Sequence, residues 1–133
     1  MSPMTTITPT RVSASPVYVV LPAEDIERAR SFYEEKLGIE LKDSPGGLIG
    51  MAGSGTGLFI YKTGHTKAEH TVGLFVVPNV EEAVSELKSH GVHFEVYPDL
   101  EGVTWNGEIA DMGGSKTAWF TDSEGNILNL VEM

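Results

Sequence analysis

The fold is decided by the stretch Asp25-Ile26-Glu27-Arg28-Ala29, which has a counterpart in Asn79-Val80-Glu81-Glu82-Ala83, at an offset of 54 residues. Each stretch begins with a residue type that caps helices and continues with apolar residues at helical spacing. In the second stretch, Glu82 also stands where a capping box places an acid. A glycine then ends each helix, in Leu37-Gly38-Ile39 and in His90-Gly91-Val92. The repeated order of cap, helix and glycine indicates an internal duplication.

Short apolar runs typical of strands surround both helices. In the first half, these predicted strands are Pro16–Leu21, Ile39–Lys42, Leu48–Ala52 and Leu58–Lys62. In the second half they are Thr71–Val77, Val92–Tyr97, Thr117–Thr121 and Ile127–Glu132. We therefore predict an α+β fold of two β-α-β-β-β modules, approximately residues 16–63 and 70–133. Because neither module buries its own sheet well, we expect the modules to pair into one curved mixed sheet with helices outside and a concave cleft.

Length and composition restrict the class of protein. A chain of 133 residues without cysteine is long enough for one domain, which we place at residues 16–133. Residues 1–15 are rich in Thr, Ser and Pro without the apolar centre of a signal peptide, so we expect a disordered leader on a cytoplasmic protein. The chain has no apolar run of membrane-spanning length. A net charge of −10 without a basic cluster argues against nucleic acid as a partner.

Two longer segments carry a resemblance to a known family. The helix from Asp25 to Tyr33 followed by Leu37-Gly38, and the ending from Phe120 to Leu130 with its Asp122 and Gly125-Asn126, resemble the vicinal oxygen chelate superfamily. This superfamily contains glyoxalase I, bleomycin resistance proteins and extradiol dioxygenases. The resemblance covers nearly all of Val17 to Met133. It implies a glyoxalase-like fold, usually assembled as a homodimer, with a small-molecule ligand in the concave cleft.

The resemblance also implies where a metal would be held. In metal-using members the ligands come from the first strand of each module, the last strand of the first module, and a Glu in the final strand. Carried onto this chain, these positions fall near Tyr18, Val72 and Tyr61, and at Asn129. Phenol, isopropyl and amide side chains are poor ligands for divalent metals. We therefore expect no metal and no other cofactor, with His70, two residues before Val72, as a weak alternative ligand.

The cleft is expected to be apolar with a few hydrogen-bonding groups, as small-molecule sites usually are. By strand alternation, Asn129 and Tyr18 face the cleft, and we expect Val72 and Tyr61 beside them. The long loop Pro98–Ser115 carries Trp105, which either stacks on a ligand or packs against the protein.

The same loop carries Glu108 and Asp111, which are either solvated charges or candidates for a catalytic base. Gly113-Gly114 is predicted to be a turn and not a phosphate loop, because no helix follows it. Trp119, in the strand after this loop, is either a core residue or a further ligand contact.

Three functions follow from these residues. The first is a metal-free member that binds a small aromatic or cationic organic molecule, as drug-sequestering proteins do. The second is a lyase, isomerase or dioxygenase, either metal-dependent through His70 or metal-independent through Glu108 or Asp111. The third is a non-catalytic subunit whose surface matters more than its cleft.

Overall fold

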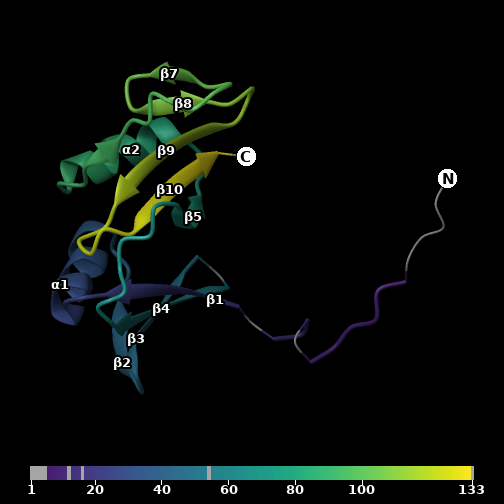
Figure 1. Cartoon of the computed structure of the whole chain (residues 1–133), viewed down its shortest axis with the longest axis vertical. Helices are drawn as coiled ribbons and strands as arrows, with labels where there is room; N and C mark the ends of the chain where they lie inside the picture. Colours follow the sequence, from purple (N-terminus) through teal and green to yellow (C-terminus); the bar gives the residue numbers. More distant parts are fainter. Residues whose placement is uncertain (1–5, 12, 16, 54, 133) are drawn as a thin grey trace.

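The computed structural model describes residues 6–11, 13–15, 17–53 and 55–132, and its elements repeat one order twice (Figure 1). The first module consists of β1 (Tyr18–Ala23), α1 (Ile26–Ser31), η1 (Phe32–Lys36), β2 (Leu41–Ser44), β3 (Gly47–Ala52) and β4 (Thr56–Lys62). The second consists of β5 (Thr71–Val76), α2 (Val80–Ser89), β6 (Phe94–Glu95), β7 (Thr104–Asn106), β8 (Ile109–Asp111), β9 (Lys116–Thr121) and β10 (Ile127–Glu132). The predicted α+β class and duplicated order are confirmed.

Both helices begin at the predicted caps. The Asp25 carboxylate accepts a hydrogen bond from Arg28 N at 3.0 Å, and Asn79 Oδ1 accepts one from Glu82 N at 2.9 Å. These side chains satisfy N–H groups that have no partner within the first turn of a helix. In α2 a second N–H, that of Val80, donates to Glu132 Oε1 at 2.8 Å, so the end of β10 also holds the start of this helix.

The first predicted helix changes its winding half-way. After α1 the chain forms a wider π-type turn, η1, in which Leu37 N donates to Phe32 O at 3.4 Å. Such turns insert one extra residue into an α-helix. Gly38, with φ of 71°, then ends the helical segment as predicted, because its left-handed conformation is unfavourable for residues with a side chain.

The strands pair in equivalent orders in the two modules. The first sheet has the order β1-β4-β3-β2 with β1 and β4 parallel, and the second contains β5-β10-β9 with β5 and β10 parallel. Strand β9 then pairs with β6 through Phe120 and Trp119, and with β8 through Thr117 and Lys116. The predicted strand Val92–Tyr97 is therefore short, because β8 occupies the rest of the β9 edge.

The loop Pro98–Ser115 is more ordered than expected. It contains the hairpin β7-β8, which extends the second sheet to six strands. Gly113 and Gly114 form the predicted turn between β8 and β9, where both N–H groups donate to Asp111 Oδ1 at 3.0 Å. The hairpin has no counterpart in the first module as described.

The expected single curved sheet is divided into two. Within the described residues no ladder joins the sheets, although strands β1 and β5 lie beside each other at the seam between the modules. The modules instead share one hydrophobic core on the helix-covered faces, which includes Leu21, Tyr33 and Ile60 from the first module and Val80, Phe120 and Leu128 from the second. Apolar packing between the modules replaces the backbone hydrogen bonds that a continuous sheet would require.

The turn between β9 and β10 also joins the modules. Buried Asp122 accepts hydrogen bonds from the Tyr33 hydroxyl at 2.6 Å and from Asn126 Nδ2 at 2.8 Å, and Asn126 Nδ2 also donates to Pro22 O at 3.0 Å. Burial, followed by the charge of Asp122 and the hydrogen bond to it, raises the pKa of Tyr33 well above its ordinary value, so this phenol remains a donor. The ending that carries the family resemblance therefore anchors the second module to β1 and η1 of the first.

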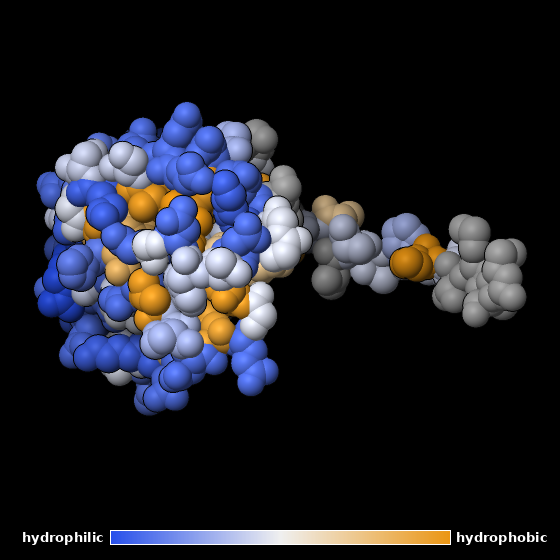
Figure 2. Space-filling view, turned by 90° about the horizontal axis from the view of Figure 1, so that it is seen from above, coloured by the Kyte–Doolittle hydropathy of each residue, from blue (hydrophilic) through white to orange (hydrophobic). Residues whose placement is uncertain are grey.

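The N-terminal residues are separate from this core. Residues 6–11 and 13–15 are exposed and project from the body of the molecule (Figures 1 and 2). Residues 1–5, 12 and 16 of the expected leader and first strand, and Met133, lie outside the described residues. No helix among the residues described has the length and apolar character required to cross a membrane.

Figure 2 also shows apolar patches among the hydrophilic side chains at the end of the molecule that carries the second module.

Candidate ligand-binding site

The second sheet has one face on the core and one open face. Strand alternation places Ala118, Phe120, Leu128 and Leu130 against the helices, where they are almost completely buried. Their neighbours Thr117, Trp119 and Asn129 therefore share the opposite face, where Trp119 and Asn129 are directly paired. We refer to this face of β5, β10, β9 and β8, which is turned away from the core, as the open face of the second module.

Three aromatic side chains gather on this open face. The Trp105 and Trp119 rings lie 5.9 Å apart, and the Tyr97 and Trp119 rings lie 5.6 Å apart at an interplanar angle of 83°. Trp119 Nε1 donates to Thr71 Oγ1 at 3.1 Å, which orients the indole ring. The hairpin brings Trp105 to this cluster, because Trp105 pairs with Ala110, and Ala110 pairs with Thr117 of β9.

Asn129 lies on the same face and is 8% exposed. Its Nδ2 donates to Thr117 Oγ1 at 3.0 Å, and Thr117 Oγ1 donates its own proton to Leu130 O at 2.8 Å. Since a hydroxyl has a single proton, Thr117 accepts from Asn129, and this bond determines the orientation of the amide. Asn129 Oδ1 is thereby left as a buried acceptor without a partner in the described part of the chain.

A second buried polar atom lacks a partner near this face. Trp105 Nε1 forms no hydrogen bond within the described residues. Buried polar groups are nearly always paired, and an unpaired one has a cost of roughly 1 to 3 kcal/mol. Trp105 Nε1 and Asn129 Oδ1 are thus a buried donor and a buried acceptor that the described residues leave unpaired near this face.

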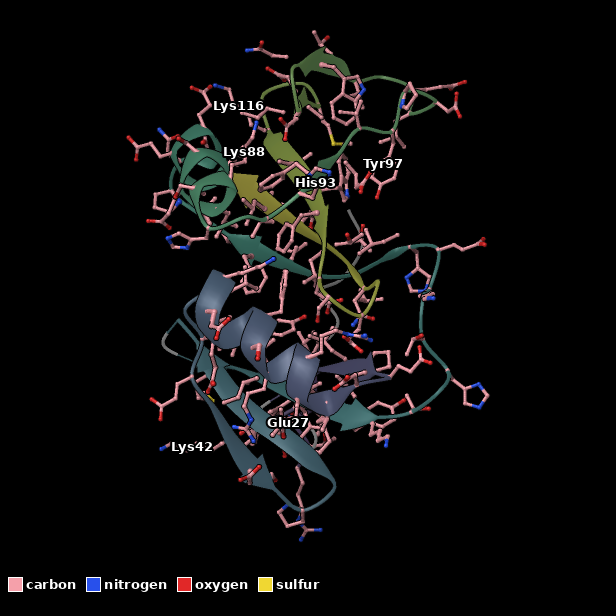
Figure 3. All side chains as sticks on the ribbon, turned by 90° about the vertical axis from the view of Figure 1, so that its left-hand side faces the viewer. Glu27, Lys42, Lys88, His93, Tyr97 and Lys116 are labelled. Atoms are coloured by element: carbon pink, nitrogen blue, oxygen red, sulfur yellow. The ribbon has the colours of Figure 1, made fainter. Side chains whose placement is uncertain are left out.

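A cavity of about 470 Å³ adjoins the aromatic cluster. Tyr97 and Trp119 line it together with Glu69, His70 and Asp99. In Figure 3, Tyr97 and Lys88 of α2 lie at opposite sides of the second module. Burial, followed by the nearby charge of Glu95, raises the pKa of the Tyr97 hydroxyl, so it is protonated at neutral pH. The cavity therefore combines aromatic walls with two carboxylates and an imidazole.

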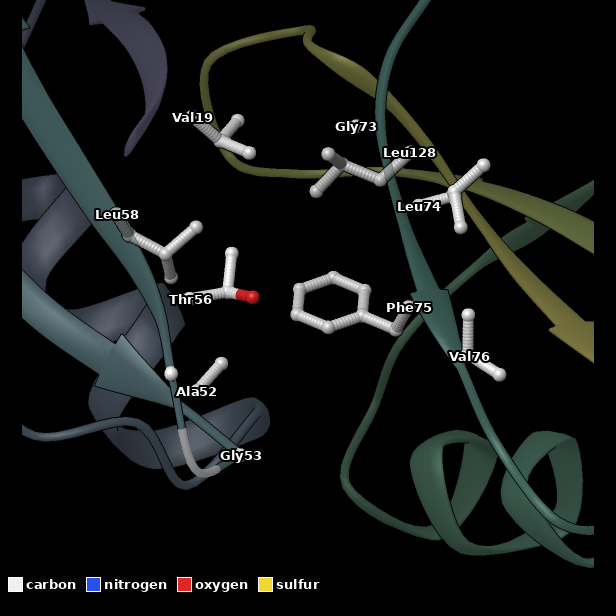
Figure 4. A pocket seen from close by; sticks show the side chains of 11 residues that line it. Val19, Ala52, Gly53, Thr56, Leu58, Gly73, Leu74, Phe75, Val76 and Leu128 are labelled. Carbon is white, nitrogen blue, oxygen red and sulfur yellow. The ribbon is translucent and has the colours of Figure 1, made fainter. Parts of the chain in front are cut away.

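A smaller cavity of about 300 Å³ lies at the seam between the modules. Figure 4 shows that its walls are mainly aliphatic, with the Phe75 ring pointing across the seam toward Thr56. Thr56 supplies a side-chain hydroxyl to this cavity. Specific ligand sites combine apolar walls with several polar groups, so this seam is less suited to selective binding than the open face of the second module.

Tyr18 and Tyr61 lie on the face of the first sheet that is turned away from the core, which we refer to as the open face of the first module. They are 36% and 37% exposed, and Tyr61 pairs with Pro22 of β1. The Tyr18 ring lies over Gly57, where a Cβ atom would come within 2.3 Å of the ring. The structure thus places both tyrosines on a sheet surface, but on a different sheet from Trp105, Trp119 and Asn129.

Val72 differs from its predicted orientation. A bulge shifts the pairing of β5 with β10, so that Ile127 pairs with Thr71 and Leu128 pairs with Gly73. An extra residue reverses the alternation at that point, and Val72 packs against the hydrophobic core. Thr71 and Leu74 occupy the positions on the open face where the sequence predicted Val72.

The two candidate bases lie apart from the aromatic cluster. Glu108 forms a salt bridge with Lys88 of α2 at 2.6 Å, and Asp111 accepts hydrogen bonds from the Gly113 and Gly114 N–H groups. Ile109, between them in β8, packs against the core, and strand alternation gives Asp111 the same direction. Both carboxylates therefore have structural partners away from Trp119.

His70 is one of the residues that line the cavity. Its Nδ1 lies 3.1 Å from Thr71 O. Because a carbonyl accepts and does not donate, Nδ1 is the donor in this contact. Among the residues described, no three His, Asp or Glu side chains are grouped so that they could hold a metal ion.

The residues at the family metal positions do not fit a divalent ion. At these positions the open faces carry the phenols of Tyr18 and Tyr61 and the amide of Asn129. In β5, where the family would supply a further ligand, the side chains on the open face are those of Thr71 and Leu74. Zinc, iron and nickel centres are built from imidazole, carboxylate or thiolate ligands. His70 adds one imidazole without a second ligand beside it, so we derive no step through a metal.

Sequence reasoning did not identify Tyr97, Thr117 and Thr71 as parts of this site. Tyr97 ended a predicted strand, and alternation from Glu95 would have placed it beside Trp119. Thr117 stood two residues from Trp119, which gives it the same face. The bulge that brings Thr71 onto the open face has no comparable signal in the sequence.

Comparison with known proteins agrees with this architecture. The family model described as the Glyoxalase/Bleomycin resistance protein/Dioxygenase superfamily matches residues 15–130. The chain belongs to this superfamily. The match extends over both modules, including the hairpin β7-β8. No curated protein sequence matches the chain.

Solved structures of superfamily proteins share the fold. A protein from Bacillus anthracis assigned to the glyoxalase family has a TM-score of 0.67 at 20% identity, with 97% of this chain and 98% of that chain covered. A glyoxalase family protein from Enterococcus faecalis has a TM-score of 0.61 at 25% identity, over 86% and 94% of the two chains. TnmS3, an antibiotic binding protein from Streptomyces sp. CB03234, has a TM-score of 0.62 at 19% identity, over 89% and 94%.

Proposed function

We propose that this superfamily member binds a small, partly aromatic organic molecule on the open face of the second module, without a divalent metal. The observation that carries the proposal is the aromatic cluster of Tyr97, Trp105 and Trp119 beside two buried, unpaired polar atoms. Aromatic side chains provide large contact area, and the unpaired atoms provide direction. A ligand that donates to Asn129 Oδ1 and accepts from Trp105 Nε1 would satisfy both.

Sequestration is favoured over catalysis through Glu108 or Asp111 by the placement of these two carboxylates. A general base must lie within hydrogen-bond reach of the proton it removes. Glu108 and Asp111 are engaged by Lys88 and by the turn at Gly113, away from the cluster. The antibiotic-binding activity named for TnmS3, which shares the fold, is consistent with a binding role. A cytoplasmic location remains a prediction.

We also propose that the chain acts as a homodimer. The open faces expose apolar side chains, among them Val20 at 52% and Met51 at 54% in the first module and Leu74 at 50% and Val76 at 62% in the second. Exposed apolar side chains on sheet faces support an association site, and a second copy provides a matching surface by two-fold symmetry.

Binding is tested with bleomycin and with the neutral, planar 1,8-dihydroxyanthraquinone as probes. Tryptophan fluorescence and thermal unfolding are followed at increasing probe concentration, because a ligand selective for the folded protein raises its melting temperature. We expect at least one probe to bind, and Trp105→Leu to weaken that binding about tenfold, as truncation of a central aromatic contact typically does. Ile7→Ala, in the segment that projects from the body, is the control and is expected to leave binding unchanged.

Two results would contradict the proposal. The first is that neither probe changes fluorescence or melting temperature, or that Trp105→Leu binds as well as the unaltered protein. The second is a divalent ion, found by elemental analysis at one per chain, that raises the melting temperature. That result would favour the metal-dependent enzyme through His70.

A further inference from the structure

The cavity beside the aromatic cluster has walls that meet at nearly a right angle. The Tyr97 and Trp119 rings are inclined by 83° with their centres 5.6 Å apart, and both rings line the cavity. The electron-rich face of an aromatic ring attracts a cation that lies within about 6 Å of its centre. The two rings form an edge-to-face pair, so a cation in the cavity would meet an open ring face beside the second ring.

The orientation of this corner is held in place by the protein itself. Thr71 Oγ1 accepts the Trp119 Nε1 proton, and Trp105 packs against Trp119 at 5.9 Å from ring centre to ring centre. Trp119 is 9% exposed and is one of the residues that line the cavity. A cation entering the corner would therefore meet a preorganised surface and not a mobile side chain.

Two carboxylates line the same cavity without a basic partner. Glu69 and Asp99 take part in none of the salt bridges that the described residues form. Glu95 adds a third negative charge near Tyr97, since it pairs with Trp119 across the sheet. His70 also lines the cavity, and its Nδ1 lies 3.1 Å from Thr71 O. The potential in the cavity therefore favours a positive ligand.

We propose that the corner formed by Tyr97 and Trp119 is a subsite for an organic ammonium group, with Glu69 and Asp99 supplying the compensating charge. The inference rests on the proposed binding function and narrows its ligand class: a molecule with an aromatic part against Trp105 and Trp119 and an alkylated amine in the cavity. The long-range attraction of a protein with net charge −10 acts in the same direction.

The test uses two probes of equal shape and different charge. Choline carries a trimethylammonium group, and 3,3-dimethylbutan-1-ol carries a neutral tert-butyl group in its place. Binding is measured at pH 8 from the indole N–H signals of the two tryptophans in NMR titrations. We expect choline to bind at least about fivefold more tightly than the neutral alcohol, with the larger shift at Trp119.

Substitutions separate the two parts of the subsite. Tyr97→Leu removes one aromatic wall and is expected to abolish the preference for choline, whereas Tyr97→Phe keeps the ring and restores most of that preference. The double variant Glu69→Gln/Asp99→Asn is expected to weaken choline binding about fivefold and to leave the alcohol unaffected. Glu101→Gln, an acid in the same loop that does not line the cavity, is the control.

The outcomes distinguish this inference from the proposed function. If 1,8-dihydroxyanthraquinone binds in a Trp105-dependent way but choline and the alcohol bind equally, the aromatic site stands and the ammonium subsite is wrong. If choline is preferred but Tyr97→Leu keeps the preference, the subsite is also wrong, because the cation is then held elsewhere. If bleomycin, the anthraquinone and choline all fail to bind, both proposals fail.

Discussion

Asn129 shows how a single hydrogen-bonded chain orients a side-chain amide. Leu130 O receives the Thr117 proton, Thr117 accepts from the Asn129 amide, and Asn129 Oδ1 is left directed away from that pair. The free protein bears the cost of this unpaired oxygen, which a ligand donor would remove. Functional sites typically contain residues that lower the stability of the ligand-free protein and increase its affinity for the ligand.

This arrangement predicts opposite effects of Asn129→Leu on stability and on binding. The substitution removes a buried acceptor without a partner, so we expect the ligand-free protein to unfold at the same temperature or slightly higher. Affinity for the probe that binds the unaltered protein is expected to fall about tenfold. Thermal unfolding and fluorescence titration measure the two effects. A clear loss of stability with unchanged affinity would instead identify Asn129 as a purely structural residue.

At the scale of elements, the turn between β9 and β10 holds the start of α1. Glu124 is enclosed, with 0% side-chain exposure, and receives hydrogen bonds from Arg28 Nε at 2.7 Å and from Asp25 N at 2.8 Å. Burial alone would raise the pKa of Glu124. The hydrogen bonds from Arg28, Asp25 and Ser123, with the charge of Arg28, outweigh burial and lower this pKa to about 2.

The lowered pKa predicts a pH dependence of stability. Because Glu124 has an ordinary value of 4.5 when unfolded and about 2 when folded, its contribution is complete above pH 4.5 and is lost as the pH falls toward 2. We expect Glu124→Gln to reduce the free energy of unfolding by about 2 kcal/mol at pH 6 and by much less at pH 2.5. Urea unfolding at both pH values measures the difference.

A second ion pair provides the control for this prediction. Arg30 and Asp43 form a salt bridge at 2.6 Å, but the Asp43 side chain is 90% exposed. Exposed pairs contribute little because water screens them, so Asp43→Asn is expected to change the free energy of unfolding only slightly at pH 6. If Glu124→Gln behaves like Asp43→Asn at pH 6, the turn does not stabilise the start of α1 as described.

At the scale of the whole molecule, two modules share a core but not a sheet. The turn at Asp122 and the common apolar cluster hold them together, while the outer faces of both sheets remain partly apolar. A chain that covered these faces with its own elements would need further helices. In the proposed homodimer, a second copy would cover them without additional sequence.

The homodimer is tested by mass in solution. We expect light scattering to give twice the chain mass of 14.4 kDa. Val76→Glu places a charge on an exposed apolar position of β5 and is expected to shift the protein toward the monomer. Ile7→Glu, in the segment that projects from the body, is the control and is expected to leave the mass unchanged. A mass of one chain for the unaltered protein at micromolar concentration would contradict the homodimer.

Much of the architecture could be predicted because its signals are local. Caps at Asp25 and Asn79, and stops at Gly38 and Gly91, depend on a few neighbouring residues and were located correctly. The hairpin β7-β8 was missed because its strands are three residues each, too short for a period-2 pattern. Trp105, Trp119 and Asn129 were named as candidates, but their proximity could not be derived, and their role in binding remains a prediction.

The sequence by itself determined the duplicated element order, the family and the absence of good metal ligands at the positions implied by the resemblance, since each follows from residue identity and short-range pattern. Tertiary structure decided the rest. The bulge at Val72, the partners of Glu108 and Asp111, and the meeting of Tyr97 with Trp119 all depend on which segments lie side by side. Such contacts between residues far apart in the chain arise from packing and register, which no local stretch of sequence specifies.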